Sequence, residues 1–156
     1  MPDNNFIDIS LSEVGKKPIR FDNDDNRVVY INISDVGVIG RISDSLPNIE
    51  NILADVFTVD LTEAETDAEK TANVLSEVFA NGDKQIRELI DNIFNAPVSD
   101  AACNEGNMLD IFNGSYRFEY ILTALMNVYE DNISKEYSTM ASKISKHTDK
   151  YKQVKQ

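Results

Sequence analysis

The stretch that decides the fold runs from Ile90 to Leu122 and reads IDNIFNAPVSDAACNEGNMLDIFNGSYRFEYIL. It contains two near-copies of one short phrase, DNIFN at Asp91–Asn95 and DIFN at Asp110–Asn113. Pro97 follows the first copy and Gly114 follows the second. Proline cannot continue a helix and glycine permits left-handed turns, so both residues mark places where helices end. The stretch therefore predicts a corner at which one helix ends and another begins.

Helices are expected on both sides of this corner. The segment Thr62–Glu65 has the form of a capping box, in which the hydroxyl bonds an early helix N–H and the glutamate reaches back to the cap. Apolar residues then follow helical spacing as far as Phe94, which predicts a helix over about 62–94. A short helix is expected over about 98–104. The last helix is expected from about 115, continuing almost to the end of the chain.

The first third of the chain contains extended segments joined by turns. FIDISL (6–11), PIRF (18–21) and RVVYINI (27–33) alternate apolar and polar residues or carry β-branched residues. EVGKK and DNDDN separate them, and such residues favour turns. We therefore expect a small antiparallel β-hairpin or a three-stranded meander over about 6–33.

A first helix is expected directly after these strands, over about 35–57. Ser34 and Asp35 offer an N-cap, and the apolar residues that follow keep helical spacing. Pro47 lies inside the helix, where it removes a backbone donor and crowds the preceding turn, so a kink or a break is expected near Ser45. Gly37 and Gly40 are expected to let another helix or strand approach closely.

These elements define an α+β fold that is mainly helical, with one acidic domain over 1–132 and a basic helical extension over 133–156. A chain of 156 residues is long enough for one ordinary core. The extension holds six lysines against Glu136 and Asp149, a balance of +4, so a net charge of −12 leaves −16 for residues 1–132. The basic extension either attracts polyanions or is a solvated helix end with cations at its negative terminus.

The last helix carries an apolar seam with near-heptad spacing: Leu122, Met126, Tyr129, Ile133, Tyr137, Met140, Ile144, His147 and Tyr151. Beyond Ile133 the seam is narrow and its surroundings are polar. Such a helix either packs against one partner helix, from the same chain or another, or frays. We interpret His147 as a seam residue rather than a ligand. The residues expected to contact a partner are Tyr129, Ile133, Tyr137, Met140, Ile144 and Tyr151, and a homo-oligomer through this helix is one such arrangement.

No pattern in the sequence predicts a catalytic or metal site. DNDDN (22–26) begins like an EF-hand loop, but Arg27 stands where glycine is needed and Ile33 where a bidentate glutamate is needed, so a turn is favoured. Zinc takes three or four nitrogen and sulfur ligands, and the chain has one cysteine and one histidine, Cys103 and His147, 44 residues apart. Cys103 also has no predicted base beside it to activate its thiol. We therefore expect Cys103 to pack in the core, and the protein to be no enzyme and to have no cofactor.

Composition also limits the partners. An acidic body repels nucleic acid phosphates, since binding there depends on lysine and arginine. No run of eighteen apolar residues is present that could span a bilayer. The N-terminal segment MPDNNFIDIS lacks the features of a secretory signal, and one cysteine forms no internal disulfide. A cytoplasmic protein that binds neither nucleic acid nor membrane is expected.

The order of these elements resembles that of the tail assembly chaperones of long-tailed bacteriophages and prophages of Gram-positive bacteria. In those small acidic proteins a segment similar to Ile90-Asp91-x-Ile93-Phe94 ends one helix. A loop and a second turn similar to Phe112-Asn113-Gly114 lead into the last helix through an aromatic residue such as Phe118. The family often has glycine directly after the first phenylalanine, where this chain has Asn95, the next best residue for a left-handed helix end.

The resemblance implies a non-catalytic protein of the host bacterial cytoplasm that binds the tape measure protein and keeps it soluble until the tail tube assembles around it. It makes Phe94, Phe112, Phe118 and Leu122 candidates for client contact, with core packing at the corner as the alternative. Two other functions remain open from the sequence. One is a structural tail or head-completion subunit, and the other is a small acidic regulatory or anti-host protein.

Overall fold

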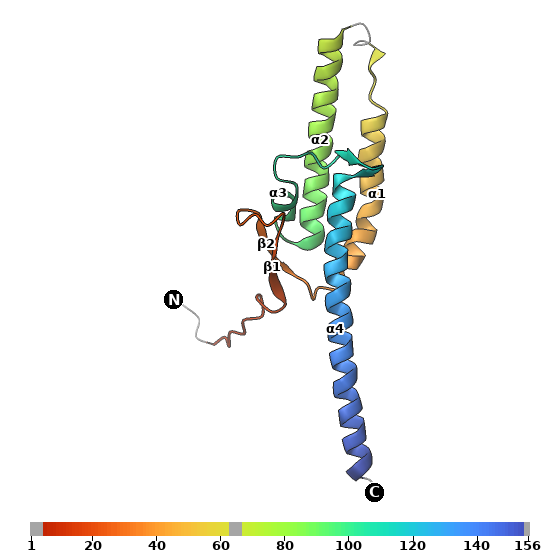
Figure 1. Ribbon diagram of the computed structural model, residues 1–156. Coiled ribbons are helices and arrows are strands. Elements are labelled where there is room, and N and C mark those ends of the chain that lie inside the picture. Colours follow the sequence, from red (N-terminus) through yellow and green to blue (C-terminus); the bar gives the residue numbers. More distant parts are fainter. Residues whose placement is uncertain (1–4, 63–66, 155–156) are drawn as a thin grey trace.

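The computed structural model describes residues 5–62 and 67–154, with side chains as far as residue 145. Its helices are α1 (Gly37–Phe57), α2 (Ala68–Phe94), α3 (Val98–Cys103) and α4 (Arg117–Val154), and its strands are β1 (Lys16–Arg20), β2 (Val28–Asn32), β3 (Ile111–Phe112) and β4 (Ser115–Tyr116). The fold is therefore α+β and mainly helical, with an N-terminal antiparallel hairpin and a long C-terminal helix, as predicted (Figure 1).

β1 and β2 form an antiparallel hairpin in which Pro18 lies opposite Tyr30. The DNDDN segment is the turn between them, and Asp22 and Asn23 have left-handed φ angles of 54° and 57°, which asparagine and aspartate tolerate. The guanidinium of Arg27 donates to the Asp22 carboxylate at 2.6 Å and to the main-chain oxygens of Ala101 and Ala102 at 2.8 and 2.6 Å. The turn predicted from the sequence is confirmed, and it is tied to α3.

The predicted strand at FIDISL is wrong, because residues 6–11 belong to no strand. Phe21 N–H donates to Arg27 O and Ile33 N–H donates to Gly15 O, so the odd-numbered residues of the hairpin bond across it. The even-numbered residues of β1 then point their backbone groups outward, toward the position that a third strand would occupy. Pro18 is the middle one of these and has no N–H. The outer edge of β1 is thus a poor template for the meander.

α1 runs through Pro47 without a break, so of the two outcomes expected near Ser45 the break is wrong, and the kink stays a prediction. One face of α1 is buried along its whole length, from Val38 to Val56, and this packing holds both halves of the helix in place. Ser45 is buried on the same face and its hydroxyl donates to the main-chain oxygen of Arg41 at 2.7 Å.

α2 begins later than the capping box predicts. Its N-cap is Asp67, whose carboxylate accepts from the backbone N–H groups of Glu69 and Lys70. Thr62 instead bonds the carboxylate of Asp60 through its N–H and its hydroxyl, and Glu65 lies outside the described residues. At the other end Asn95 has a left-handed φ of 51° and its N–H donates to Asp91 O, so the predicted asparagine cap is confirmed.

The second copy of the phrase forms a tiny hairpin that the sequence did not predict. Ile111 pairs with Tyr116 and Phe112 with Ser115. The two turn residues, Asn113 and Gly114, have φ angles of 50° and 81°, the left-handed pair that a tight two-residue hairpin requires. The chain enters α4 directly after this turn.

The core lies where α1, α2 and the first half of α4 come together and the β1–β2 hairpin covers one side (Figure 1). α1 and α2 lie side by side and run in opposite directions. The second half of α4 extends beyond the other helices, and the N-terminal segment runs away from them. Within the described part of the chain, no helix has the length and apolar character needed to cross a membrane.

Candidate partner-binding surface

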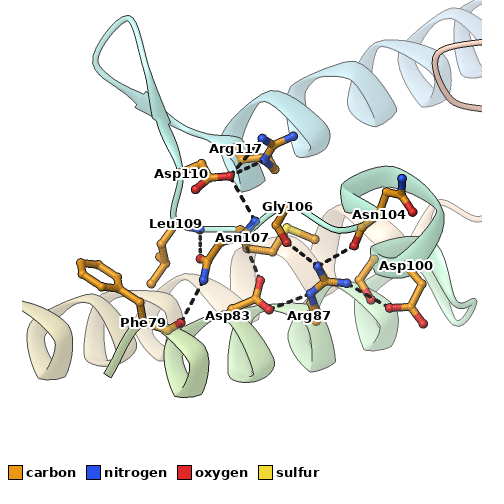
Figure 2. A network of polar contacts seen from close by, with 12 residues as sticks. Phe79, Asp83, Arg87, Asp100, Asn104, Gly106, Asn107, Leu109, Asp110 and Arg117 are labelled. Carbon is orange, nitrogen blue, oxygen red and sulfur yellow. Dashed lines mark hydrogen bonds and ion pairs between the residues drawn. The ribbon is translucent and has the colours of Figure 1, made fainter. Parts of the chain in front are cut away.

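The corner is held together by a polar network centred on Arg87 of α2 (Figure 2). Its guanidinium donates to Asp83 at 2.9 Å, to Asp100 of α3 at 3.0 Å, and to the main-chain oxygens of Asn104 and Gly106 at 3.1 and 2.8 Å. A planar guanidinium with several donors suits this task, since it satisfies carbonyls that end a helix and a carboxylate at once. The loop after α3 is thereby fixed against α2.

The same network continues toward α4. The second carboxylate oxygen of Asp83 accepts from the N–H of Met108 at 2.7 Å. Asp110 accepts from the N–H of Asn107 at 3.1 Å and from the guanidinium of Arg117 at 3.1 Å. Asp100, Asp110 and Asn107 of the opening stretch are therefore used to hold the loop, and their bonds account for its shape.

Cys103 packs in the core, as predicted. Its side chain is buried, and burial raises the pKa of the thiol despite the nearby positive charge of Arg87. A neutral buried thiol is a weak nucleophile and behaves as a small apolar side chain. Among the residues that the structure describes, no group of three or more His, Cys, Asp or Glu side chains is placed to hold a metal ion.

Two of the residues expected to contact a partner are instead buried in the protein's own core. Phe94 is 3% exposed and Tyr129 is 1% exposed, and their rings lie 5.9 Å apart. Phe118 is also buried, and Leu122 packs against the core. The expectation that Phe94 and Tyr129 form a partner surface is therefore corrected: they close the junction of α2 with α4.

Phe112 differs from Phe94 and remains 48% exposed. The guanidinium of Arg117 lies 5.1 Å from the centre of its ring, a cation–π contact. The hydroxyl of Tyr120 donates to the main-chain oxygen of Phe112 at 2.7 Å. A groove of about 410 Å³ lies beside these side chains, and Phe21 and Ile121 also line it. Sequence reasoning missed Arg117 and Tyr120; their spacing of three residues at the start of a helix was the available signal.

The seam of α4 changes from buried to exposed along the helix. Ile133 is half-buried, whereas Tyr137, Met140 and Ile144 are 62%, 53% and 62% exposed. We call these three residues the α4 stripe. Asn132 donates to Ile33 O at 3.2 Å where α4 leaves the body, and a groove of about 290 Å³ lies there beside Tyr137 and Met140. The side chains of His147 and Tyr151 lie outside the described residues.

Of the eight residues predicted to contact a partner, Phe94 and Tyr129 are buried and Phe112 lies on the surface at the corner. The other five lie along α4: Ile133, Tyr137, Met140, Ile144 and Tyr151. The structure does not bring Phe112 and the α4 stripe together, since Phe112 precedes α4 and the stripe lies on its projecting half (Figure 1). No protein-family model matches the chain, and no curated protein or solved structure is similar enough to count as a match.

Proposed function

We propose that this protein is a non-catalytic chaperone that binds an apolar helical client through the α4 stripe. We further propose that it is a phage tail assembly chaperone of the host cytoplasm, whose client is the tape measure protein. The observation that carries the proposal is the exposure of Tyr137, Met140 and Ile144 on a helix that extends beyond the rest of the molecule (Figure 1).

The spacing and chemistry of the α4 stripe favour a helical client. The three residues recur after three and four positions, so they lie on one face of α4. Apolar anchors at this spacing are how amphipathic helices engage another helix or an apolar groove. A tyrosine and a methionine suit such contacts, because tyrosine is rigid and amphipathic and methionine adapts its shape to irregular partners.

The charge of the protein supports the same function. A net charge of −12 keeps molecules apart in solution, and a complex with an apolar client inherits this repulsion. The cations, in contrast, are concentrated near the stripe, where Lys135 and Lys143 are exposed on the same helix. The stripe therefore lies in the basic extension, which balances to +4, and not in the body, which balances to −16.

The resemblance noted in the sequence supplies the specific client. α2 ends at Phe94, a loop follows, and Phe112-Asn113-Gly114 leads into α4 through Phe118, which is the order that the resemblance implies. This agreement supports the chaperone proposal at the level of layout. The client's identity rests on the resemblance alone.

Co-expression with the tape measure protein of the same phage genome tests the proposal. The wild-type protein is expected to raise the soluble yield of the tape measure protein and to co-purify with it. The variant Tyr137→Ala/Met140→Ala/Ile144→Ala is expected to lose both effects, because alanine keeps the helix but removes the apolar anchors. The control Ser138→Ala/Ser142→Ala/Ser145→Ala changes exposed positions off the stripe and is expected to act as wild type.

Two results would overturn the proposal. If the wild-type protein neither binds the tape measure protein nor raises its soluble yield, the chaperone function is wrong. If both triple variants retain full binding, the α4 stripe is not the client site. Mass spectrometry of purified virions adds a separate criterion, since an assembly chaperone is absent from the mature particle and a structural subunit is present in it.

A further inference from the structure

We propose that the N-terminal segment Phe6–Leu11 of one copy adds as a third strand to the outer edge of β2 in a second copy, so that two copies exchange these segments reciprocally. The inference concerns a surface separate from the α4 stripe and does not depend on the client. It rests on two unpaired features of the same chain, an extended apolar segment and an open strand edge.

The N-terminal segment has the sequence of a strand but pairs with no strand among the described residues. Ile7, Ile9 and Leu11 alternate with polar Asp8 and Ser10, the pattern of a strand with one buried face. Yet Ile7, Ile9 and Leu11 are 90%, 75% and 67% exposed. No hydrogen bond is described for the backbone of residues 6–10. A run of large apolar residues held in water is unfavourable unless another surface covers it.

The outer edge of β2 is the open template. Because the odd-numbered residues bond across the hairpin, Val28 and Tyr30 point their N–H and C=O groups away from β1. No hydrogen bond is described for either of these N–H groups. Their side chains are 37% and 63% exposed, which gives an incoming strand apolar neighbours on the solvent face. The opposite edge, on β1, lacks a donor at Pro18.

The turn before β1 directs the chain's own segment away from this edge (Figure 1). Residues 11–16 form a tight turn in which Val14 N–H donates to Leu11 O and Lys16 N–H donates to Glu13 O, and Gly15 has a φ of 80°. The turn delivers the segment to the β1 side of the hairpin. The outer edge of β2 is two strand spacings away, roughly 10 Å, with β1 in between. A second copy meets no such obstacle.

A second copy also matches the segment in charge and number. β2 reads VVYIN and carries no charge, and residues 6–11 carry only Asp8, so no like charges meet across the added pair. Each copy has one segment and one open edge, so two copies satisfy each other completely. A symmetric pair of this kind is closed, because it uses both N-terminal segments and both open β2 edges and leaves neither free for a further copy.

Measurement of molar mass by light scattering over a concentration series tests the exchange. The wild-type protein is expected to have twice the mass of the chain. Deletion of residues 2–11 is expected to halve this mass, and so is Tyr30→Pro, which removes one outward N–H as Pro18 does on β1. The stripe variant Tyr137→Ala/Met140→Ala/Ile144→Ala is expected to remain dimeric. A monomeric wild type, or a dimer that survives the deletion, overturns the inference.

Disulfide cross-linking locates the contact and does not depend on a variant that fails to dimerise. A protein carrying Ile9→Cys is mixed with a protein of different tag length carrying Val28→Cys, Tyr30→Cys or Asn32→Cys, and then oxidised. Cross-linked heterodimer is expected in at least one mixture, at about tenfold or more above the level with Ser138→Cys. Equal cross-linking to Ser138→Cys overturns the inference. The native Cys103 is buried and stays in place.

Discussion

Arg87 shows how one side chain holds a corner that the backbone alone would leave loose. It joins α2 to Asp100 of α3 and to two carbonyls of the loop that follows. Its side chain is 18% exposed, and its bond to the Gly106 oxygen is partly buried, whereas its bonds to Asp100 and Asn104 are exposed. The loop residues they fix lead directly into the small hairpin and α4. The direction of α4 therefore depends on this residue.

Replacement of Arg87 by methionine is expected to lower the free energy of unfolding by about 1–3 kcal/mol, because the partly buried Asp83 carboxylate and Gly106 oxygen lose their donor. The control is Arg20→Met, which breaks an ion pair with Asp25 whose side chains are 50% and 89% exposed. That change is expected to cost less than about 1 kcal/mol. Urea denaturation measures both. Equal losses would show that the Arg87 network does not stabilise the corner.

The side chain of Tyr129 is buried together with its polar hydroxyl group. Its hydroxyl has no hydrogen-bond partner among the described residues, and burial, with a smaller contribution from Asp35, raises its pKa to about 12. The folded state thus resists loss of this proton, whereas the unfolded chain loses it near pH 10. The stability associated with the neutral hydroxyl is fully present below pH 10 and is lost as the pH rises toward 12.

The variant Tyr129→Phe has no proton to lose at this position. Between pH 10 and pH 12 the wild type is expected to lose about 2–3 kcal/mol more stability than the variant. Below pH 9 the variant is expected to be as stable as the wild type or slightly more, since it buries no unpaired hydroxyl. Denaturation of both proteins at matched pH values measures the difference. Parallel pH curves would contradict the buried position of the hydroxyl.

At the scale of elements, two glycines inside helices have opposite roles. A Cβ on Gly82 of α2 would lie 2.8 Å from the Leu109 side chain and 3.2 Å from the Val56 side chain. A Cβ on Gly40 of α1 would meet nothing within 4 Å. Gly82 therefore allows α1 and the loop to approach α2, which is the role expected from the sequence for Gly37 and Gly40. That expectation is wrong for Gly40.

Alanine substitutions at these two glycines are expected to have opposite signs. Gly40→Ala should raise the free energy of unfolding by about 0.5–1 kcal/mol, because alanine loses less backbone freedom in a helix. Gly82→Ala should lower it by about 1 kcal/mol, because overpacking outweighs the same gain. Thermal or urea denaturation compares the pair. A stabilised Gly82→Ala variant would show that Leu109 moves aside freely.

At the scale of the whole molecule, α4 belongs to two environments. Its first half supplies Ile121, Leu125 and Tyr129 to the core, whereas its residues from Ser134 to Ser145 are exposed. An isolated helical segment of this length is only marginally stable in water, since most helix stability in proteins comes from packing. The projecting half is therefore the part of α4 that a client would stabilise.

Hydrogen exchange of the free protein is expected to reveal this division. Amides of residues 121–133 should be protected to nearly the same degree as those of α2 around Ile86 and Ile90, because they open only when the core opens. Amides of residues 136–145 should exchange at least tenfold faster. Addition of a client that covers the α4 stripe should slow the second group selectively. Uniform protection along α4 in the free protein would contradict this division.

The sequence by itself determined the local structure where short-range physics is sufficient. Turn residues correctly predicted the loop of the β1–β2 hairpin, and asparagine predicted the left-handed end of α2. Apolar periodicity predicted the helices, including the long α4. Local rules failed where distant contacts decided the outcome. Packing along one face carries α1 through Pro47, and the chain leaves FIDISL unpaired because Pro18 weakens the neighbouring edge.

Only the tertiary structure decided which residues face the protein and which face a partner. Phe94 and Phe112 occupy the same place in two nearly identical phrases, yet they are 3% and 48% exposed. Phe94 lies at the end of a long helix that packs beside α4, and Phe112 lies in a two-residue strand at the surface. The burial of a side chain depends on which helices and strands pack against it, and a short sequence segment does not specify those contacts.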